Sequence, residues 1–309
     1  MVKPFPKAYE NFKFQISWED LDFSHVKEVI KFGLREDAGG NFKSLKKFPD
    51  ITTNACKINK TGEALIVSRE PMVICGLKLL PLIFESAGAK NIDVDYLCND
   101  GNSLQEKINI ARLSGSQFEI LTIERIILNF LQKLSGIATK THFFSTQLES
   151  FGVHFLDTRK TTPSMRGLEK YATACGGGFN HRMGLFDRIL IKDNHLAAKK
   201  CQQGWELENF LSKIVSHYAS SYLIEVEIDS LEQLEPALRA NVDAVLLDNF
   251  SPEEIKEAVS INKQKAVLEA SGGINENTLQ EFARSKPHFI SSGYPIHSSR
   301  WMDIGMDWS

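Results

Sequence analysis

Six short apolar segments recur in the second half of the chain, and they restrict its fold more than any other feature. Most are separated from the next by a stretch with helical periodicity, such as Ser230–Arg239 and Pro252–Val259. Continuous apolar runs that alternate with helices indicate parallel strands covered on both faces. The segments, between residues 153 and 292, read VHFLD, RILIK, YLIEVE, AVLLD, AVLEAS and HFISS.

The spacing of the later segments indicates how these strands are arranged. Their ends at Glu227, Asp248, Ser271 and Ser292 lie 21 to 23 residues apart, which is the length of one βα unit. Six such strands in succession favour a closed α/β barrel over an open sheet, although the spacing alone allows both.

The first part of the chain has a different pattern. It begins with a helical stretch, and Gly and Asn-Asp-Gly turns then separate short strand-like runs, so we expect an antiparallel sheet with helices on one side. From Leu121 a long helical pattern begins, as one helix or a pair. The other segments are a helix at about 18–35, strands at 63–67, 94–97 and 108–112, and an exposed loop at 38–47.

The composition is that of an ordinary globular protein. The chain has 309 residues, 42% of them hydrophobic, and a net charge of −3, which argues against a general nucleic-acid or membrane surface. No apolar stretch approaches a membrane span, and the first residues lack the apolar region of a signal peptide. The five scattered cysteines form no CxxC pair and favour reduced thiols over a disulfide framework or a zinc site. We therefore expect a cytoplasmic protein.

Polar residues end each predicted strand. In an α/β barrel the carboxyl ends of the strands meet on one face, where active sites lie. The sequence therefore predicts one pocket with cations from the early strands, carboxylates from the middle ones and Ser/Gly loops from the last. These residues are Asp157 with Arg159-Lys160, Lys192-Asp193, Glu227, Asp248, Ser271-Gly272-Gly273 and Ser291-Ser292-Gly293.

The cations form the most unusual part of this set. Arg159 and Lys160 follow the first strand, and His181-Arg182 follow three glycines at 176–178, where the backbone can approach a ligand closely. An arginine matches a carboxylate bidentately, and a desolvated pair contributes about 1.5–3 kcal/mol. The cluster predicts a ligand with several carboxylates, or with a carboxylate and a pyrophosphate, rather than a solvated basic face.

Lys192 leaves an apolar strand. A buried ammonium without a partner costs several kcal/mol, so this lysine should meet an anion or act as a nucleophile. A Schiff-base lyase is therefore an alternative function. A lysine that only extends to solvent at the barrel rim is the structural alternative.

The remaining strand ends suggest sugar, metal and phosphate contacts. Glu227 and Asp248 could hold Mg²⁺ through water or accept hydrogen bonds from sugar hydroxyls, or they could cap helices or pair with lysines. The loops at 271–273 and 292–293, with a helix start expected at about Asn275, resemble a phosphate cradle. Alternatively, Gly272-Gly273 only turns the chain.

Together these and further segments resemble one known family, quinolinate phosphoribosyltransferase. The similarity runs in order from about Glu36 to the C-terminus. It is carried by LREDAGG…DITTNA, TGEALIVSRE, ERIILNFLQKLSGIAT, DTRKTTP…R…EKYA…GGGFNHRMGL…ILIKDNH, EVEIDSLEQL, LLDNF and EASGGI.

The resemblance implies a fold and a reaction. The fold is α/β, with an incomplete α/β barrel at 122–282 and an N-terminal α/β sandwich at 1–121, completed by about 283–309, as in type II phosphoribosyltransferases. The reaction joins quinolinate to 5-phosphoribosyl 1-diphosphate with Mg²⁺, and gives nicotinate mononucleotide, pyrophosphate and CO₂ for NAD synthesis. No nucleic-acid or membrane partner is implied.

The resemblance also implies residue roles. Arg159, His181 and Arg182 would line the quinolinate pocket, with Lys160 and Lys192 reaching toward quinolinate or the diphosphate. Arg125 matches an arginine donated across a homodimer interface into a shared active site, and the dimers could assemble into a hexamer. Glu227 and Asp248 would face ribose hydroxyls and Mg²⁺, the metal through water and diphosphate. The 5′-phosphate loops would be Ser271-Gly272-Gly273 and Ser292-Gly293.

Two positions depart from the family pattern. Ser164-Met165 stands where a Gly-Leu pair is usual, and Tyr294-Pro295 changes the last phosphate loop. Three alternatives remain beside the main prediction: a paralogue that uses another acid such as nicotinate or serves molybdenum transport, the Schiff-base lyase, and a non-catalytic anion-binding protein.

Overall fold

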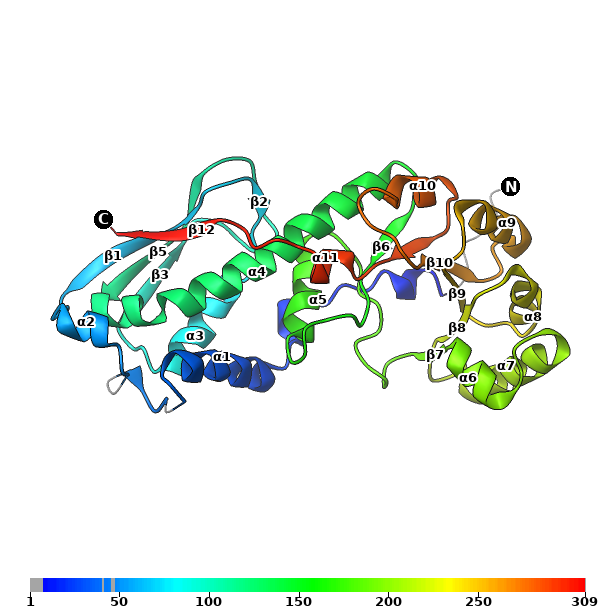
Figure 1. Cartoon of the computed structure of the whole chain (residues 1–309), viewed down its shortest axis with the longest axis horizontal. Coiled ribbons are helices and arrows are strands. Elements are labelled where there is room, and N and C mark those ends of the chain that lie inside the picture. Colours follow the sequence, from blue (N-terminus) through cyan, green and yellow to red (C-terminus); the bar gives the residue numbers. More distant parts are fainter. Residues whose placement is uncertain (1–7, 41, 46–47, 309) are drawn as a thin grey trace. The chain divides into compact units, whose positions relative to one another are not determined.

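The computed structural model describes residues 8–40, 42–45 and 48–308, which form two compact units (Figure 1). The barrel unit comprises residues up to Gln15 together with Phe143–Thr161 and Gly178–His297. The sandwich unit comprises Ile16–His142, Thr162–Gly177 and the residues from Ser298 onward.

The barrel unit contains a parallel sheet in the order β6-β11-β10-β9-β8-β7. The first strand along the chain thus pairs with the last, as in a barrel, and a bridge from Leu156 to Phe179 continues beyond β6. This confirms the predicted parallel strands. They are β6 (His154–Leu156), β7 (Ile189–Ile191), β8 (Ile224–Ile228), β9 (Ala244–Asp248), β10 (Val267–Ser271) and β11 (Phe289–Ser291).

Helices cover the outer face of this sheet (Figure 1). Alternate strand residues such as Val226, Leu247 and Leu268 are buried against them, while the residues between face the barrel interior. The predicted helices after β8 and β9 are confirmed. The helices are α6 (Asp193–Lys199), α7 (Gly204–Tyr218), α8 (Leu234–Arg239), α9 (Pro252–Asn262), α10 (Leu279–Arg284) and α11 (Tyr294–His297).

The expected helix start at about Asn275 is wrong. Asn275 begins a turn in which its N–H donates to the Thr278 hydroxyl at 3.0 Å, and α10 starts only at Leu279. The side-chain hydrogen bond competes with helical backbone pairing, as is common for Asn and Thr.

The N-terminal segment closes one end of the barrel. Tyr9 and Phe12 are buried with Ala244, Val267 and Phe289, the first residues of β9, β10 and β11. We had expected this segment in the first domain. It belongs to the barrel unit because its aromatic rings pack against the first residues of β9, β10 and β11.

The sandwich unit contains an antiparallel sheet in the order β12-β1-β5-β3 and a short β2-β4 pair. The three predicted strands are confirmed, and the C-terminal strand β12 lies beside β1 (Figure 1). The strands are β1 (Thr61–Ser68), β2 (Met72–Val73), β3 (Ile92–Tyr96), β4 (Ser103–Leu104), β5 (Ile108–Ser116) and β12 (Ile304–Trp308). The helices are α1 (Phe23–Asp37), α2 (Ile51–Ala55), α3 (Leu80–Ala87), α4 (Gln117–Glu149) and α5 (Arg166–Cys175).

The units have other bounds than the predicted 1–121, 122–282 and 283–309. The change of pattern at Leu121 marks the beginning of α4, which is one continuous helix and runs from the sandwich unit into the barrel unit after His142. The predicted exposed loop at 38–47 includes the buried Leu45, while its residues 41, 46 and 47 lie outside the described residues. Within the described residues, no helix is both long and apolar enough to span a membrane.

The sandwich unit depends on a close approach at Gly136 of α4. A Cβ at this position would lie 2.1 Å from the Arg300 carbonyl oxygen, and the Met302 N–H donates to the Gln132 carbonyl at 3.1 Å. We predict that Gly136→Ala lowers the free energy of unfolding by about 1–3 kcal/mol, because the segment before β12 must move.

Urea denaturation tests this prediction, with Gly167→Ala as the matched control. At Gly167 a Cβ would meet only the end of the Leu21 side chain, at 3.3 Å, so little loss of stability is expected. Equal stabilities of the two variants would contradict a rigid backbone contact at Gly136.

Candidate active site

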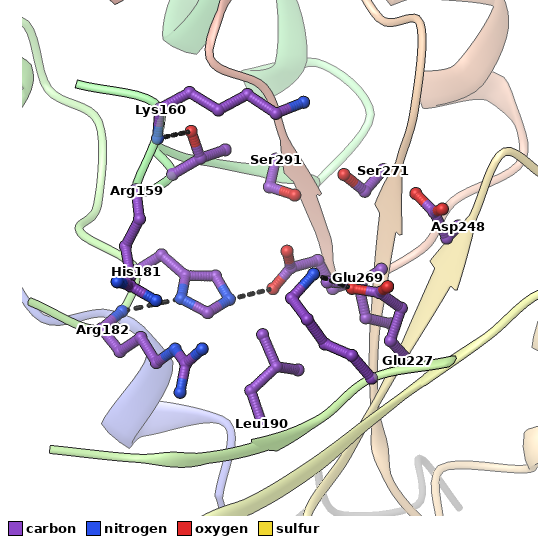
Figure 2. Close-up of a pocket in the computed structure, with 13 residues that line it drawn as sticks. Arg159, Lys160, His181, Arg182, Leu190, Glu227, Asp248, Glu269, Ser271 and Ser291 are labelled. Carbon is purple, nitrogen blue, oxygen red and sulfur yellow. Dashed lines mark hydrogen bonds and ion pairs between the residues drawn. The ribbon is translucent and has the colours of Figure 1, made fainter. Parts of the chain in front are cut away.

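A cavity of about 490 Å³ opens at the carboxyl ends of the barrel strands (Figure 2). A second cavity of about 290 Å³ adjoins it and shares Thr158, Lys160, Ser271 and Ser291. The first is lined by Thr158, Arg159, Lys160, His181, Arg182, Leu190, Lys192, Glu227, Leu246, Asp248, Glu269, Ser271 and Ser291. The structure therefore brings most of the predicted site residues together.

Asp157 positions the cationic side of the cavity. This buried carboxylate accepts hydrogen bonds from Asn180 Nδ2 at 2.7 Å and from the backbone N–H of His181 at 2.8 Å. These hydrogen bonds fix the segment that contains Asn180 and His181. In the same segment, Arg182 Nη1 donates to the Arg188 carbonyl at 3.2 Å. Asp157 thus contributes to the site by positioning Asn180 and His181.

The two arginines have unused hydrogen-bonding capacity. The Nε atoms of Arg159 and Arg182 are buried without a hydrogen-bond partner in the described part of the chain. Burial, followed by the charge of Arg159, lowers the pKa of Arg182. Buried donors are rarely left unpaired, so the arrangement is typical of a site that an anion completes.

The three glycines at 176–178 have another role than expected. A Cβ on Gly176 would lie 2.4 Å from the Ala138 carbonyl oxygen, so this glycine allows α5 to end close against α4 within the sandwich unit. None of the three lines either described cavity. Gly176 therefore allows the close packing of α5 on α4.

Two carboxylates lie opposite the arginines (Figure 2). Glu227 accepts a hydrogen bond from Lys192 Nζ at 2.6 Å. Burial raises the pKa of both Glu227 and Asp248, although Lys192 lowers it in each case. The cavity thus has a cationic side and a carboxylate side, with Lys192 between charges of both signs.

The second cavity contains the predicted phosphate loops. Gly272 has φ +103°, and a Cβ there would lie 2.3 Å from Asn249 Oδ1, so only glycine fits. The buried Ser292 hydroxyl donates to the Ile274 carbonyl at 2.7 Å and accepts from the Tyr294 N–H at 3.1 Å. Ser292 therefore joins the two loops, and the Tyr294 N–H, in the segment that departs from the family pattern, is already used.

Asp157 and Asp193 were predicted in the pocket but line neither cavity, and Arg125 does not line them either. It lies on α4 in the sandwich unit, where it is exposed. Ser164, at the other departure from the family pattern, has φ +67°, the left-handed conformation that glycine adopts without strain.

Three charged residues were not predicted: Arg188 and Glu225, which do not line the cavity, and Glu269, which does. Arg188 Nη1 lies 3.2 Å from Glu225 Oε2, and His181 Nε2 lies 3.4 Å from Glu225 and 3.6 Å from Glu269. The sequence did contain a signal for them, because residues two apart on a strand share a face. Arg188 precedes Lys192 by two such steps, Glu225 precedes Glu227 by one, and Glu269 precedes Ser271 by one.

The surroundings of the two buried glutamates shift their pKa values in opposite directions. Burial raises the pKa of Glu225, but the contacts with His181 and Arg188 outweigh it and lower this pKa to about 2. Burial, followed by the charge of Glu225, raises the pKa of Glu269 well above its usual range. Adjacent buried carboxyl groups cannot easily both ionise, and Arg188 decides which one does.

We predict that Glu225→Gln lowers the free energy of unfolding by about 3–5 kcal/mol at neutral pH, because it leaves Arg188 buried without its counter-charge. Glu269→Gln should cost much less, since it replaces a neutral group by a neutral one. The Glu225 carboxylate contributes fully to the free energy of unfolding above the pKa of a glutamate in the unfolded chain, about 4.3. This contribution is lost as the pH falls toward 2.

Chemical denaturation of both variants measures this difference. A difference between wild type and Glu225→Gln that stays constant between pH 7 and pH 2.5 would contradict the assignment of the charge to Glu225.

Fold and cavity together define an α/β-barrel protein with a site for a small polyanion. Comparison with known proteins identifies its family. The quinolinate phosphoribosyl transferase C-terminal domain matches residues 137–307, and the N-terminal domain of the same family matches residues 50–135. The chain belongs to the quinolinate phosphoribosyltransferase family.

Individual relatives agree with this assignment. The chain is 37% identical to a probable carboxylating nicotinate-nucleotide pyrophosphorylase of Bacillus subtilis, over 93% of this chain and 94% of that protein. It is 35% identical to the carboxylating nicotinate-nucleotide pyrophosphorylase of Mycobacterium leprae, over 93% and 99%. The solved nicotinate-nucleotide pyrophosphorylase of Francisella tularensis superposes with a TM-score of 0.84 at 35% identity, over 94% of this chain and 98% of that one.

Proposed function

We propose that this protein transfers phosphoribosyl from 5-phosphoribosyl 1-diphosphate to quinolinate, with release of pyrophosphate and CO₂ and formation of nicotinate mononucleotide. The observation that carries the proposal is the division of the cavity, with unsatisfied arginines on one side and carboxylates on the other. A pyridine dicarboxylate suits the first side and ribose hydroxyls suit the second. The relatives named above support the same reaction.

The cationic residues would bind the acid. Arg159 and Arg182 would each direct N–H groups to a carboxylate of quinolinate, and His181 would contribute a wall beside them. Lys160 and Lys192 would reach toward quinolinate or the diphosphate. Because Lys192 is paired with Glu227, it carries a positive charge that stabilises a departing anion.

The remaining residues would bind the phosphoribosyl donor. Glu227 and Asp248 would accept hydrogen bonds from ribose hydroxyls, and the loops at Ser271-Gly272-Gly273 and Ser292-Gly293 would surround the 5′-phosphate. In the second loop the role falls to the backbone, since the Ser292 hydroxyl is engaged with Ile274. The residues mostly position charges around the reacting centre rather than exchange protons with it.

Mg²⁺ fits this arrangement as a partner of the diphosphate. Glu227 and Asp248 follow neighbouring strands and offer oxygen atoms, the ligands that Mg²⁺ prefers. Because Glu227 already pairs with Lys192, we propose that both carboxylates hold hydrated Mg²⁺ through water and diphosphate and not by direct ligation. When bound, the ion would neutralise charge on the diphosphate.

The Schiff-base alternative loses its main support. Catalysis by Lys192 as a nucleophile would require an uncharged amine, and the 2.6 Å contact with Glu227 favours the ammonium. The paralogue that uses nicotinate stays open to experiment.

A one-pot assay tests the reaction. We expect purified protein with Mg²⁺, phosphoribosyl diphosphate and quinolinate to form nicotinate mononucleotide, identified by mass, and we expect no product when nicotinate replaces quinolinate. Product from nicotinate alone would reassign the acid pocket, and product from neither acid would reject the proposed function.

We also propose a homodimer with shared active sites, in which Arg125 of each subunit reaches the acid pocket of the other. Its exposure on α4, and its absence from the lining of both described cavities, support this role. A hexamer of such dimers and a cytoplasmic location stay predictions.

Complementation tests the shared site. Arg125→Ala and Arg159→Ala should each abolish activity without unfolding the protein, and mixing the two should restore part of the rate, because a mixed dimer contains one unmutated site. Mass spectrometry would verify mixed dimers. Verified mixed dimers without activity would reject the shared site.

A further inference from the structure

Glu269 has an unusual environment for a residue of the cavity wall. Its side chain is fully buried, it lines the larger cavity, and neither of its oxygens has a hydrogen-bond partner within 3.5 Å in the described part of the chain. Figure 2 shows it between the cationic side with His181 and the carboxylate side with Asp248. A buried carboxyl group in this situation points to a ligand, because unsatisfied buried polar groups are costly.

The residues around Glu269 favour the protonated form of its carboxyl group. His181 Nε2 lies within 3.6 Å of both Glu225 and Glu269, so the two carboxyl groups are close together. Arg188 contacts Glu225 at 3.2 Å and gives Glu225 the negative charge. Burial, followed by the charge of Glu225, raises the pKa of Glu269 well above its usual range, which favours the protonated form.

The same three residues could be taken for a metal site, since ligand atoms of His181, Glu225 and Glu269 lie within 4.8 Å of one another. Two contacts argue against this. The Arg182 N–H donates to His181 Nδ1 at 2.7 Å, so the ring proton is on Nε2, the atom that faces the carboxyl groups. The Arg188 guanidinium already balances Glu225. A proton of His181, and not a metal ion, therefore lies between these residues.

We propose that Glu269 is the general acid that supplies the proton to the pyridine carbon from which CO₂ leaves. This rests on the proposed function. In the step, the bond between the ring carbon and its carboxylate breaks and CO₂ departs. The electron pair stays on the ring carbon and takes the proton from the Glu269 carboxyl group. The resulting carboxylate recovers a proton from solvent water.

Other residues of the cavity are less suited to this step. Lys192 Nζ donates a hydrogen bond to Glu227 at 2.6 Å, and the ring proton of His181 faces Glu225 and Glu269. The guanidinium groups of Arg159 and Arg182 do not release protons in proteins. Lys160 is exposed at the rim. Glu269 combines a transferable proton with a place on the cavity floor.

The test separates phosphoribosyl transfer from decarboxylation in Glu269→Gln. Pyrophosphate release and nucleotide products are followed together in a single turnover with quinolinate, phosphoribosyl diphosphate and Mg²⁺. We expect pyrophosphate release to continue, while formation of nicotinate mononucleotide falls by about 100-fold or more, the usual contribution of a general acid. The nucleotide that still carries both carboxylates should accumulate and be detected by mass. Glu257→Gln, at an exposed position of α9, is the matched control and should leave both steps unchanged.

Each other outcome rejects the proposal. Equal slowing of both steps would make Glu269 a binding or structural residue, and unchanged decarboxylation would remove any role. If the wild type releases no pyrophosphate, the proposed function fails and the proposal fails with it.

An infrared measurement tests the protonation of Glu269 without any turnover. The difference spectrum between wild type and Glu269→Gln at neutral pH should contain the C=O stretch of a protonated carboxylic acid, shifted in D₂O. Carboxylate bands in its place would overturn the proposal. Circular dichroism establishes whether the variant is folded. If it is not, the difference between wild-type spectra recorded at neutral and at high pH must contain a protonated carboxyl band that is lost as pH rises, and Glu257→Gln must show the same band.

Discussion

The ion pair between Arg188 and Glu225 lies below the cavity, where both side chains are buried. A charge buried without a partner would cost several kcal/mol, so each of these residues requires the other. The pair also affects its surroundings: Glu225 lies 3.4 Å from His181 Nε2, and after burial its charge is the main cause that raises the pKa of Glu269. This contact therefore influences the titration of the groups around it.

The barrel interior is built in layers from this pair. On one side the Arg188 guanidinium lies 3.9 Å from the centre of the Phe12 ring, so the aromatic segment that closes the barrel also contacts the charged layer. On the other side the strand residues two positions further along, Glu227 and Ser271, reach the cavity. A packed end, a balanced charged layer and an open ligand layer follow one another along the same strands, which is how a parallel barrel supports a rigid site.

Much of the site could be predicted from the sequence, because strand ends in a parallel barrel converge. Arg159, His181, Arg182, Lys192, Glu227 and Asp248 were expected in one pocket and line one cavity. Glu225 and Glu269 were missed, although alternation along their strands pointed to them. They lie inside apolar runs, where a single acid gives no indication of which charge balances it. Arg188 supplies that balance from a neighbouring strand.

Local patterns failed where distant segments use the same residues. The glycines at 176–178 resembled a ligand loop, but at position 176 a side chain would collide with the Ala138 carbonyl oxygen, so glycine is needed there for packing. Ser292 was expected in a phosphate loop, and its hydroxyl joins the two loops, which leaves the backbone there for a phosphate. By itself the sequence determined the α/β class, the parallel strands and the residues at their ends, because periodicity and strand-end chemistry are local. Only the tertiary structure decided that the N-terminal aromatics close the barrel and which of two buried glutamates has its pKa raised. Both depend on contacts between segments far apart in the chain.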